Sequence, residues 1–220
     1  MMLLLTPCQL LMITLEGIMS TRESPQVREE EILNACEKLY KTMSFKEITL
    51  KEIGAETSFS RPSIYNYFQT KEEIFLALFE REYRTWMKDL EKIGKKNVDA
   101  EGLAEAIAKS LEKRALMLRL LSVNLYDMEE NSRIERLVEF KKSYCASVEA
   151  FDLLLQKALP DQNEKERRET LVAAFEFIHG VYPYAHATKK QIEAMKEAGC
   201  RYDKKSIYEL SLVGLKKIIR

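Results

Sequence analysis

The sequence is poor in the two residues that turn-rich folds need, with only 7 Gly and 5 Pro among 220 residues. A sandwich of many short strands requires more turn residues than this, whereas the abundant Leu, Glu, Lys and Ala favour helix. Hydrophobic residues make up 46% and charged residues 32% of the chain, the ordinary balance of a soluble globular protein. The composition therefore predicts an all-α protein.

An excess of charge of one sign is also missing. The chain has 35 Lys and Arg against 35 Asp and Glu, and the segment from Ser20 to Lys71 has eight of each kind. A strongly basic chain points to nucleic acid by itself. The net charge of this chain therefore neither indicates nor excludes such a partner.

Cysteine and histidine are too sparse for a disulfide framework or a metal site. No C-x-x-C pair occurs among the four cysteines, which are Cys8, Cys36, Cys145 and Cys200. This pattern predicts reduced thiols in a cytoplasmic protein. His179 and His186 have no carboxylate or cysteine at ligand spacing, so we expect neither a metal nor a cofactor. Because no Ser-His-Asp or Cys-His pattern is present, we expect the protein not to be an enzyme.

The longest apolar run is MMLLLTPCQLLMITLEGI, residues 1–18. It is too short and too interrupted to span a membrane, and it lacks the basic start and cleavage site of a secretory signal. We therefore expect no membrane partner. Because MST at Met19 resembles a natural start, we interpret residues 1–19 as an extension, either poorly ordered or translated from a misassigned start codon.

Helix signals dominate the segment that follows. In VREEEILNACEKLYKTM, residues 27–43, apolar residues recur at the spacing of one helix face, with Glu in the first turn and Lys near the end. Thr49 and Thr70 are each followed three residues later by Glu, as in a capping box. Ser60 is an N-cap signal before Pro62, which a first helical turn tolerates. We therefore expect two short helices and then a long one over 71–92.

A helix of two turns has no independent stability, so the short helices must pack against residues 27–43. The expected result is a three-helix unit that contains a helix-turn-helix. The alternative is that these signals only mark the ends of helices in an ordinary bundle.

The second short helix has the composition of a surface that reads DNA. Ile64 and Phe68 fill its inner face, so Arg61, Ser63, Asn66 and one tyrosine project outward. In a helix-turn-helix this helix enters the major groove. Arg can bind guanine and Asn adenine, while Ser or Tyr can bind phosphate.

Residues 28–75 resemble the DNA-binding domain of the tetracycline-repressor-like (TetR) family of transcriptional regulators. The resemblance rests on ILNACEKLY…F..ITLKEIGAETSFSRPSIYNYFQTKEEIF, with a Thr-led second helix, a Ser-led recognition helix ending Tyr-x-Tyr-Phe, and a Thr-Lys-Glu start to the fourth helix. Two positions depart from the usual pattern. Pro62 replaces a frequent Gly, and Ser58 occupies a turn position where Gly is common, which predicts modest backbone strain.

The resemblance implies an N-terminal three-helix helix-turn-helix DNA-binding domain, residues 20–71, and a C-terminal helical ligand-binding and dimerisation domain, residues 72–220. It also implies the residues that meet DNA. They are Thr49 and Lys51 at the start of the positioning helix, Ser60, Arg61, Pro62, Ser63 and Asn66 at the bases, and Tyr65, Tyr67 and Lys71 at phosphates. Tyr65 could equally belong to the core.

The rest of the chain continues as helices, expected at 100–110, 113–126, 130–159, 161–190 and 203–219. Asp161 with Glu164 resembles a capping box, and Pro183 should kink the helix that contains it. The resemblance implies that the last two helices pair with those of a second subunit. The alternative is that the last helix, with its small residues Ser211 and Gly214, covers the core of its own domain.

A small-molecule pocket would lie among the middle helices. The candidates are aromatic or histidine side chains, namely Trp86, Phe140, Tyr144, Phe175, His179 and Tyr182. Each of them alone is more often a core residue than a ligand contact. The segment HGVYPYAH, residues 179–186, places a polar and aromatic cluster at the expected kink, where we expect the mouth of a pocket.

Together these features predict a homodimeric repressor that binds a palindromic operator and is released by a small-molecule inducer. The hypothesis from another class is an all-helical small-molecule-binding protein whose three-helix unit docks a protein. Replacing Arg61 by Ala discriminates between the two.

Overall fold

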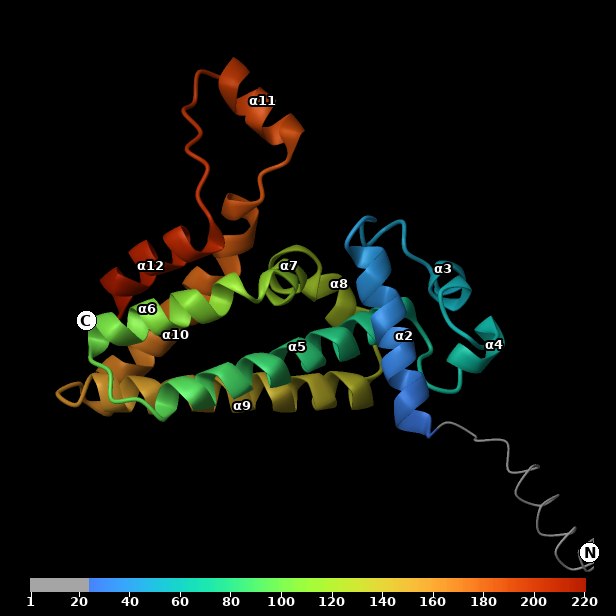
Figure 1. Cartoon of the computed structure of the whole chain (residues 1–220), viewed down its shortest axis with the longest axis horizontal. Helices are drawn as coiled ribbons and strands as arrows, with labels where there is room; N and C mark the ends of the chain where they lie inside the picture. Colours follow the sequence, from blue (N-terminus) through green and yellow to red (C-terminus); the bar gives the residue numbers. More distant parts are fainter. Residues whose placement is uncertain (1–23) are drawn as a thin grey trace, which may run out of the picture.

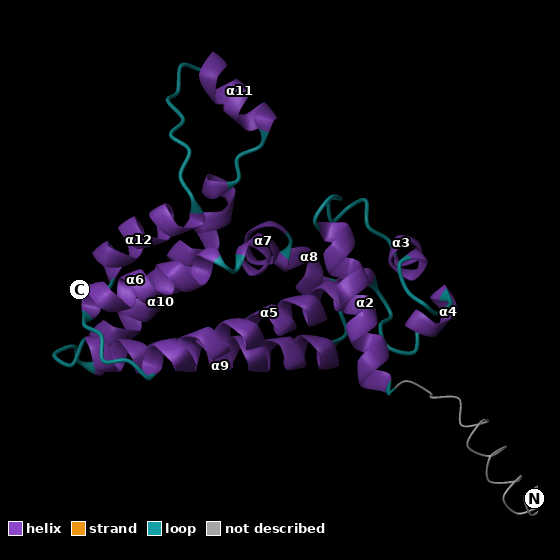
Figure 2. Cartoon of the chain, viewed as in Figure 1, coloured by secondary structure: helices purple, strands orange, loops and turns teal. Residues whose placement is uncertain are grey.

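The computed structural model describes residues 24–220, so the N-terminal extension inferred above lies outside the described residues. Every regular element in the described range is a helix, which confirms the all-α prediction (Figure 2). The helices are α2 (Pro25–Tyr40), α3 (Leu50–Ala55), α4 (Arg61–Ile64), α5 (Lys71–Gly94), α6 (Ala100–Glu112), α7 (Ala115–Val123), α8 (Leu125–Glu130), α9 (Ile134–Ala158), α10 (Glu164–Ala185), α11 (Lys189–Glu197) and α12 (Ile207–Ile218). Within this part of the chain no helix is both long and apolar enough to cross a bilayer.

Helices α2, α3 and α4 form a small unit at one end of the molecule, here called the head (Figure 1). Its core consists of fully buried side chains from all three helices, the loop before α3 and the turn after α4, namely Ile32, Cys36, Ile48, Ile53, Ile64 and Phe68. Burying these apolar side chains holds α3 and α4 in place, because neither helix is long enough to be stable alone.

The remaining helices, α5 to α12, form the body. Helices α5 and α9 lie side by side along its length, with α6, α10 and α12 packed at the end away from the head (Figure 1). Helices α7 and α8 lie between these layers and the head. An aromatic cluster fills the space between α5, α9 and α10, and its buried members are Phe79, Tyr83, Trp86, Phe140, Phe151 and Phe175.

Two helix starts differ from the expectation. Helix α2 is capped by Ser24 and begins at Pro25, so the three Glu of residues 29–31 lie beyond its first turn. Helix α10 is capped by Asn163 rather than Asp161. The side chain of Asn163 accepts a hydrogen bond from the Glu166 N–H at 3.0 Å, and the carboxylate of Glu166 accepts one from the Asn163 N–H at 2.9 Å. The true capping box therefore lies two residues past the expected one.

The segment expected as one helix over 161–190 is divided in two. Helix α10 ends at Ala185, two residues beyond Pro183, so the proline lies near the end of a helix. Pro183 has no N–H for the carbonyl of His179 four residues earlier. The hydroxyl of Ser122 on α7 donates to that carbonyl instead, at 2.6 Å. Helix α11 then follows as a separate element that stands away from the body (Figure 1).

Candidate nucleic-acid interface and effector region

Helix α4 presents a polar face to solvent because its apolar residues are fixed in the head. Ile64 and Phe68 are fully buried, whereas Arg61, Pro62, Tyr65 and Asn66 are exposed. The helix is a single turn, and residues 65–67 continue it as hydrogen-bonded turns. Side chains of the kinds that bind bases and phosphates therefore share one exposed face.

The two tyrosines of this segment occupy different environments. Tyr65 is 49% exposed, and its hydroxyl accepts a hydrogen bond from Arg61 Nη2 at 3.4 Å. Tyr67 is half-buried and packs against the core. Of the two possibilities left open for Tyr65, the structure therefore favours the surface.

The residues before each helix hold the backbone in several ways. Thr49 Oγ1 accepts the Lys51 N–H at 3.2 Å and donates to the Glu52 carboxylate. Ser60 occupies the N-cap position of α4 without a side-chain capping bond, and its hydroxyl lies 3.1 Å from that of Ser63. Thr49, Lys51 and Ser60 are all exposed to solvent.

The Lys71 side chain binds backbone carbonyls of the head. Its ammonium donates to the carbonyls of Phe45 at 2.7 Å and Ile48 at 3.0 Å, and it lies 4.4 Å from the centroid of the Phe45 ring. These contacts tie the start of α5 to the loop before α3. They leave Lys71 only one of its three N–H donors for a phosphate.

The turn between α3 and α4 is not strained, contrary to the expectation from Ser58. In the described residues no side-chain-bearing position has a positive φ. The carboxylate of Glu31 on α2 accepts both the Ser58 N–H and the Ser58 hydroxyl, the latter at 3.1 Å. The close approach between α3 and α4 is at Gly54 instead, where an added Cβ would lie 3.2 Å from Cβ of Arg61 and would push it back by a few tenths of an ångström.

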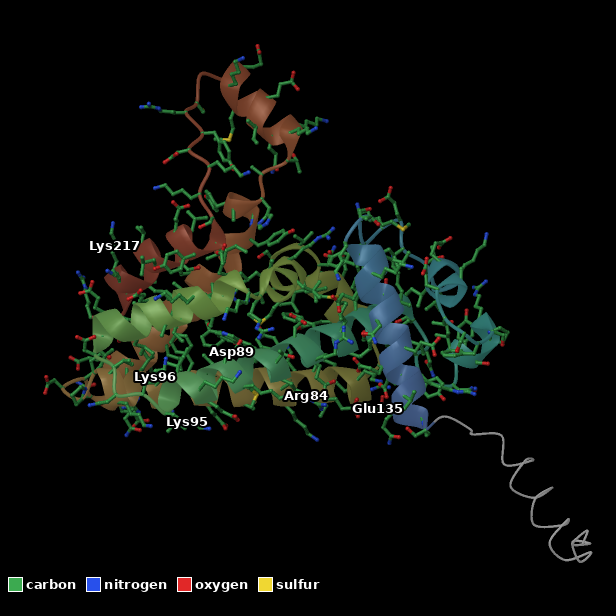
Figure 3. All side chains as sticks on the ribbon, viewed as in Figure 1. Arg84, Asp89, Lys95, Lys96, Glu135 and Lys217 are labelled. Atoms are coloured by element: carbon green, nitrogen blue, oxygen red, sulfur yellow. The ribbon has the colours of Figure 1, made fainter. Side chains whose placement is uncertain are left out.

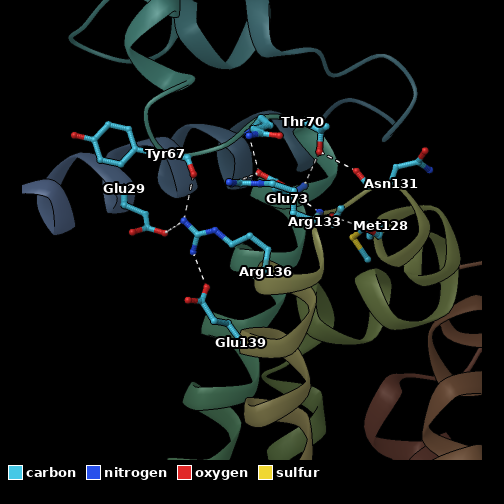
Figure 4. A network of polar contacts seen from close by, with 11 residues as sticks. Glu29, Tyr67, Thr70, Glu73, Met128, Asn131, Arg133, Arg136 and Glu139 are labelled. Atoms are coloured by element: carbon cyan, nitrogen blue, oxygen red, sulfur yellow. Dashed lines mark hydrogen bonds and ion pairs between the residues drawn. The ribbon is translucent and has the colours of Figure 1, made fainter.

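An ion pair between a buried carboxylate and an exposed arginine joins the head to the body (Figure 4). Glu73, on the first turn of α5, is fully buried and accepts Arg133 Nε at 2.6 Å and Arg133 Nη2 at 2.9 Å. It also accepts the N–H of Gln69, the residue that follows Phe68, at 2.7 Å. Burial alone raises the pKa of this carboxyl, but the bonds from the Arg133 side chain and the two backbone N–H groups lower it overall. The carboxylate is therefore held charged.

Arg136 extends the same junction from α9 (Figure 4). It pairs with Glu29 of α2 at 3.0 Å, donates to the Tyr67 carbonyl at 3.3 Å, and places its guanidinium 4.8 Å from the centroid of the Phe68 ring. The turn that ends the recognition segment is thus held directly by the body.

A second connection runs from α7 and α8 to the end of α2. The hydroxyl of Tyr40 donates to Asn124 Oδ1 at 3.0 Å, and burial raises the pKa of that hydroxyl to about 12. Arg119 donates to the carbonyls of Tyr40 and Met43, and its guanidinium lies 3.7 Å from the centroid of the Tyr40 ring. No local pattern in the sequence indicates these partners, which lie 76 to 84 residues apart along the chain.

Four of the six expected effector residues meet in the aromatic cluster. Trp86 and Tyr144 lie 6.1 Å and 6.0 Å, respectively, from Phe175 between ring centroids. Phe140 joins the cluster through Phe79 at 5.0 Å. Trp86 also donates its indole N–H to Ser110 at 3.0 Å. These rings pack directly against one another, so an effector that binds among them must move some of them.

The other two residues lie farther along α10. His179 Nδ1 is 2.7 Å from the Phe175 carbonyl, and Tyr182 stacks on His186 with ring centroids 4.2 Å apart. Beside this stack is an open groove of about 670 Å³ between the end of α10, the segment around α11 and the start of α12. Its lining includes His186, Ile192 and Tyr202. The groove lies where the HGVYPYAH segment predicted the mouth of a pocket.

The head and its junctions define a class of protein: a helix-turn-helix unit with an exposed reading face, mounted on a helical body, is a DNA-binding transcriptional regulator. Residues 32–78 match the family model of bacterial regulatory proteins of the tetR family. Residues 80–203 match the tetracyclin repressor-like C-terminal domain. The chain belongs to the TetR family, as its sequence pattern indicated.

Individual relatives agree with this assignment. The HTH-type transcriptional regulator YfiR of Bacillus subtilis strain 168 is 28% identical over 163 residues, which cover 71% of this chain and 77% of that protein. The HTH-type transcriptional regulator EthR of Mycolicibacterium smegmatis is 36% identical over 67 residues, covering 30% of this chain and 31% of that protein.

Solved structures share the fold at low sequence identity. The fatty acid degradation regulator FadR from Bacillus halodurans has a TM-score of 0.61 at 14% identity, covering 90% of this chain and 97% of its own. FadR from Bacillus subtilis, in complex with stearoyl-CoA, has a TM-score of 0.60 at 15% identity, covering 86% of this chain and 97% of its own.

Proposed function

We propose that this protein is a homodimeric transcriptional repressor that binds a palindromic operator and releases it when a small molecule binds the body. It acts in the cytoplasm, with a DNA-binding domain that ends at Lys71 and a regulatory domain that begins at Glu72. The observation that carries the proposal is the exposed face of α4, on a head that the body holds through Glu73 and Arg136.

The proposed roles at DNA follow from exposure and hydrogen-bonding capacity. Arg61 and Asn66 read base edges from the free face of α4, while Pro62 and Ser63 contact the groove beside them. Tyr65 binds a phosphate through its hydroxyl. Thr49, Lys51 and Ser60 contact the backbone on either side, and Tyr67 and Lys71 act mainly by fixing the recognition segment, with their remaining polar atoms facing phosphates.

The proposed dimer uses α10 and α12. Both present apolar side chains to solvent, with Val172 61% and Val213 53% exposed. The exposed residues near Val172 on α10 include two small ones, Ala173 and Gly180, which allow another helix to approach closely. Gly214 serves the chain itself, since it leaves room for the Phe177 ring of α10. Two heads on one dimer can meet half-sites about 34–36 Å apart, one DNA turn.

The proposed effector is an organic molecule with a large apolar part. The aromatic cluster offers an apolar lining, and Tyr144 and His179 provide half-buried polar atoms at its edge. The complex of Bacillus subtilis FadR with stearoyl-CoA supports an apolar ligand for this architecture. The effector lowers operator affinity by binding more tightly to the conformation in which α5 has moved the heads from operator spacing, because only a difference in affinity shifts an equilibrium.

A fluorescence-anisotropy titration with DNA from around its own gene tests the proposal, with a scrambled duplex alongside and several salt concentrations. We expect operator binding about a thousandfold tighter than scrambled binding. Arg61→Ala removes one base contact from each of the two heads and should reduce this ratio at least tenfold, because each bidentate contact contributes about 1–3 kcal/mol.

The matched control is Lys88→Ala, which removes one exposed positive charge from α5, away from the head. It should leave the selectivity unchanged. If Arg61→Ala binds as selectively as the unaltered chain, the DNA-reading role of α4 is wrong. The alternative of a protein-docking head then becomes the better account.

A further inference from the structure

Helix α11 contributes no buried residue to the core of its own chain. It is nine residues long, is closed at its start by a Thr188–Gln191 capping box, and contains no buried residue. In Figures 1 and 3 it stands clear of the body. Isolated helices shorter than about 12–15 residues are marginal in water. A partner is therefore needed to keep α11 helical.

The segment that carries α11, residues 186–206, is here called the arm. Its two ends are fixed, because Ala185 at the end of α10 and Ile207 at the start of α12 are buried. Between them the chain reverses after α11 at Gly199, where φ is +72°. Ile192 and Met195, three residues apart on α11, form an incompletely covered apolar edge.

The arm leaves the body between the two helices that carry exposed apolar residues. Tyr184, at the base of the arm, is 73% exposed, and Val172 lies on α10. Exposed Ala173, Glu176 and Gly180 continue this surface along α10. The arm and the outward face of α10 thus form one continuous uncovered region.

The charges of the two parts are complementary. The arm contains six basic residues and three acidic ones: Lys189, Lys190, Lys196, Arg201, Lys204 and Lys205 against Glu193, Glu197 and Asp203. Among these basic residues only Lys205 has an ion-pair partner in the described structure, Asp203 at 3.6 Å. Exposed Glu176, in the middle of the α10 face, has no ion-pair partner within residues 24–220.

We propose that the arm of each protomer packs across the outward face of α10 in its partner, with Ile192 and Met195 on that face and the arm's lysines toward Glu176. The proposal rests on the homodimer proposed above. A twofold axis perpendicular to α10 makes the two copies of this helix antiparallel, so the arm at the end of one α10 lies over the earlier part of the other. The arms therefore lock the two bodies together.

Hydrogen–deuterium exchange of the full chain tests the proposal at concentrations above and below its dimer Kd. We expect the amides of α11 and the outward face of α10 to exchange slowly at high concentration. Both should lose protection together on dilution, because the helix has no cover in the monomer.

Three other outcomes would contradict the proposal that each arm packs on α10 of the partner protomer. If α10 is protected by association while α11 exchanges fast throughout, the dimer stands without the arm. If α11 is equally protected at both concentrations, its own chain covers it. If neither helix depends on concentration, the proposed dimer fails as well.

A variant pair gives an independent measurement. Ile192→Asp combined with Met195→Asp should raise the dimer Kd about tenfold or more by sedimentation equilibrium. Val123→Asp, an exposed apolar residue on α7, is the control and should leave Kd unchanged. An arm variant that dimerises like the unaltered chain contradicts the proposal, and loss of dimer in Val172→Asp alone then shows that the α10 interface remains correct.

Discussion

Glu73 is a carboxylate that the fold keeps charged while removing it completely from water. It accepts four hydrogen bonds, one from the Gln69 N–H in the segment before α5 and three from Arg133, the N-cap residue of α9. Its lowered pKa also has a consequence for folding. A group whose pKa is lower in the folded state stabilises that state above its ordinary pKa, about 4.3 for Glu, and ceases to do so as pH falls through the folded value.

Glu73→Gln should therefore lower the unfolding free energy by about 1–3 kcal/mol near neutral pH, because Arg133 loses its charged partner. The difference from the unaltered chain should shrink as pH falls below the ordinary pKa of Glu. Urea denaturation at several pH values measures it. Glu135→Gln, an exposed residue two positions from Arg133 (Figure 3), is the control and should change little. A difference that is constant with pH contradicts the assignment.

At the scale of the element, the packing of α12 on α10 depends on a missing side chain. A Cβ added at Gly214 would overlap the ring of Phe177, with Cε1 only 2.7 Å away. Gly180 is also inside a helix, but a Cβ there meets nothing within 4 Å. Replacing each of these glycines by alanine should therefore change the stability in opposite directions.

Gly214→Ala should destabilise the monomer by about 1 kcal/mol or more, because overpacking costs about 1–3 kcal/mol and exceeds the gain in helix propensity. Gly180→Ala should stabilise it by about 0.5–1 kcal/mol. Thermal unfolding at concentrations below the dimer Kd compares the two. Equal effects of the two changes would show that Phe177 moves aside without cost.

The elements also show how far the sequence predicts this structure. Thr49 and Thr70 mark helix starts correctly because an N-cap acts on backbone groups within three residues. Asp161 misleads because Asn163 offers the same chemistry two residues later. Arg119 and Arg133 carry no signal in the sequence, since their partners lie on other helices and are brought close only by the fold. The exposed face of α4 was predictable, whereas its connection to the body was not.

At the scale of the molecule, the head and body are joined around Glu73, around Tyr40, and through Arg81 of α5, which pairs with Glu30 and Glu37 of α2. A single tryptophan, Trp86, lies buried in the body and reports its unfolding, while circular dichroism reports all helices. Because these junctions are hydrogen-bonded or ion-paired, the head and body should unfold together. Coincident transitions by the two probes are therefore expected for the unaltered chain.

Arg119→Ala removes the bonds to the Tyr40 and Met43 carbonyls and weakens this coupling. The circular dichroism transition in urea should then begin at lower concentration than the fluorescence transition of Trp86, as the head unfolds first. Lys113→Ala, an exposed residue just before α7, should keep the two curves together. Coincident curves in both variants would mean that the remaining junctions, through α9 and through Arg81 of α5, suffice.

Helix α7 contacts two segments that are far apart in the sequence, the end of α10 and the end of α2. Ser122 holds the carbonyl that Pro183 leaves free on α10, and Arg119, one turn earlier, holds the end of α2. Nine residues of helix form a rod about 13 Å long that does not bend easily. The carbonyl of His179 on α10 and the end of α2 are therefore joined through one short helix, by a route that does not include α5.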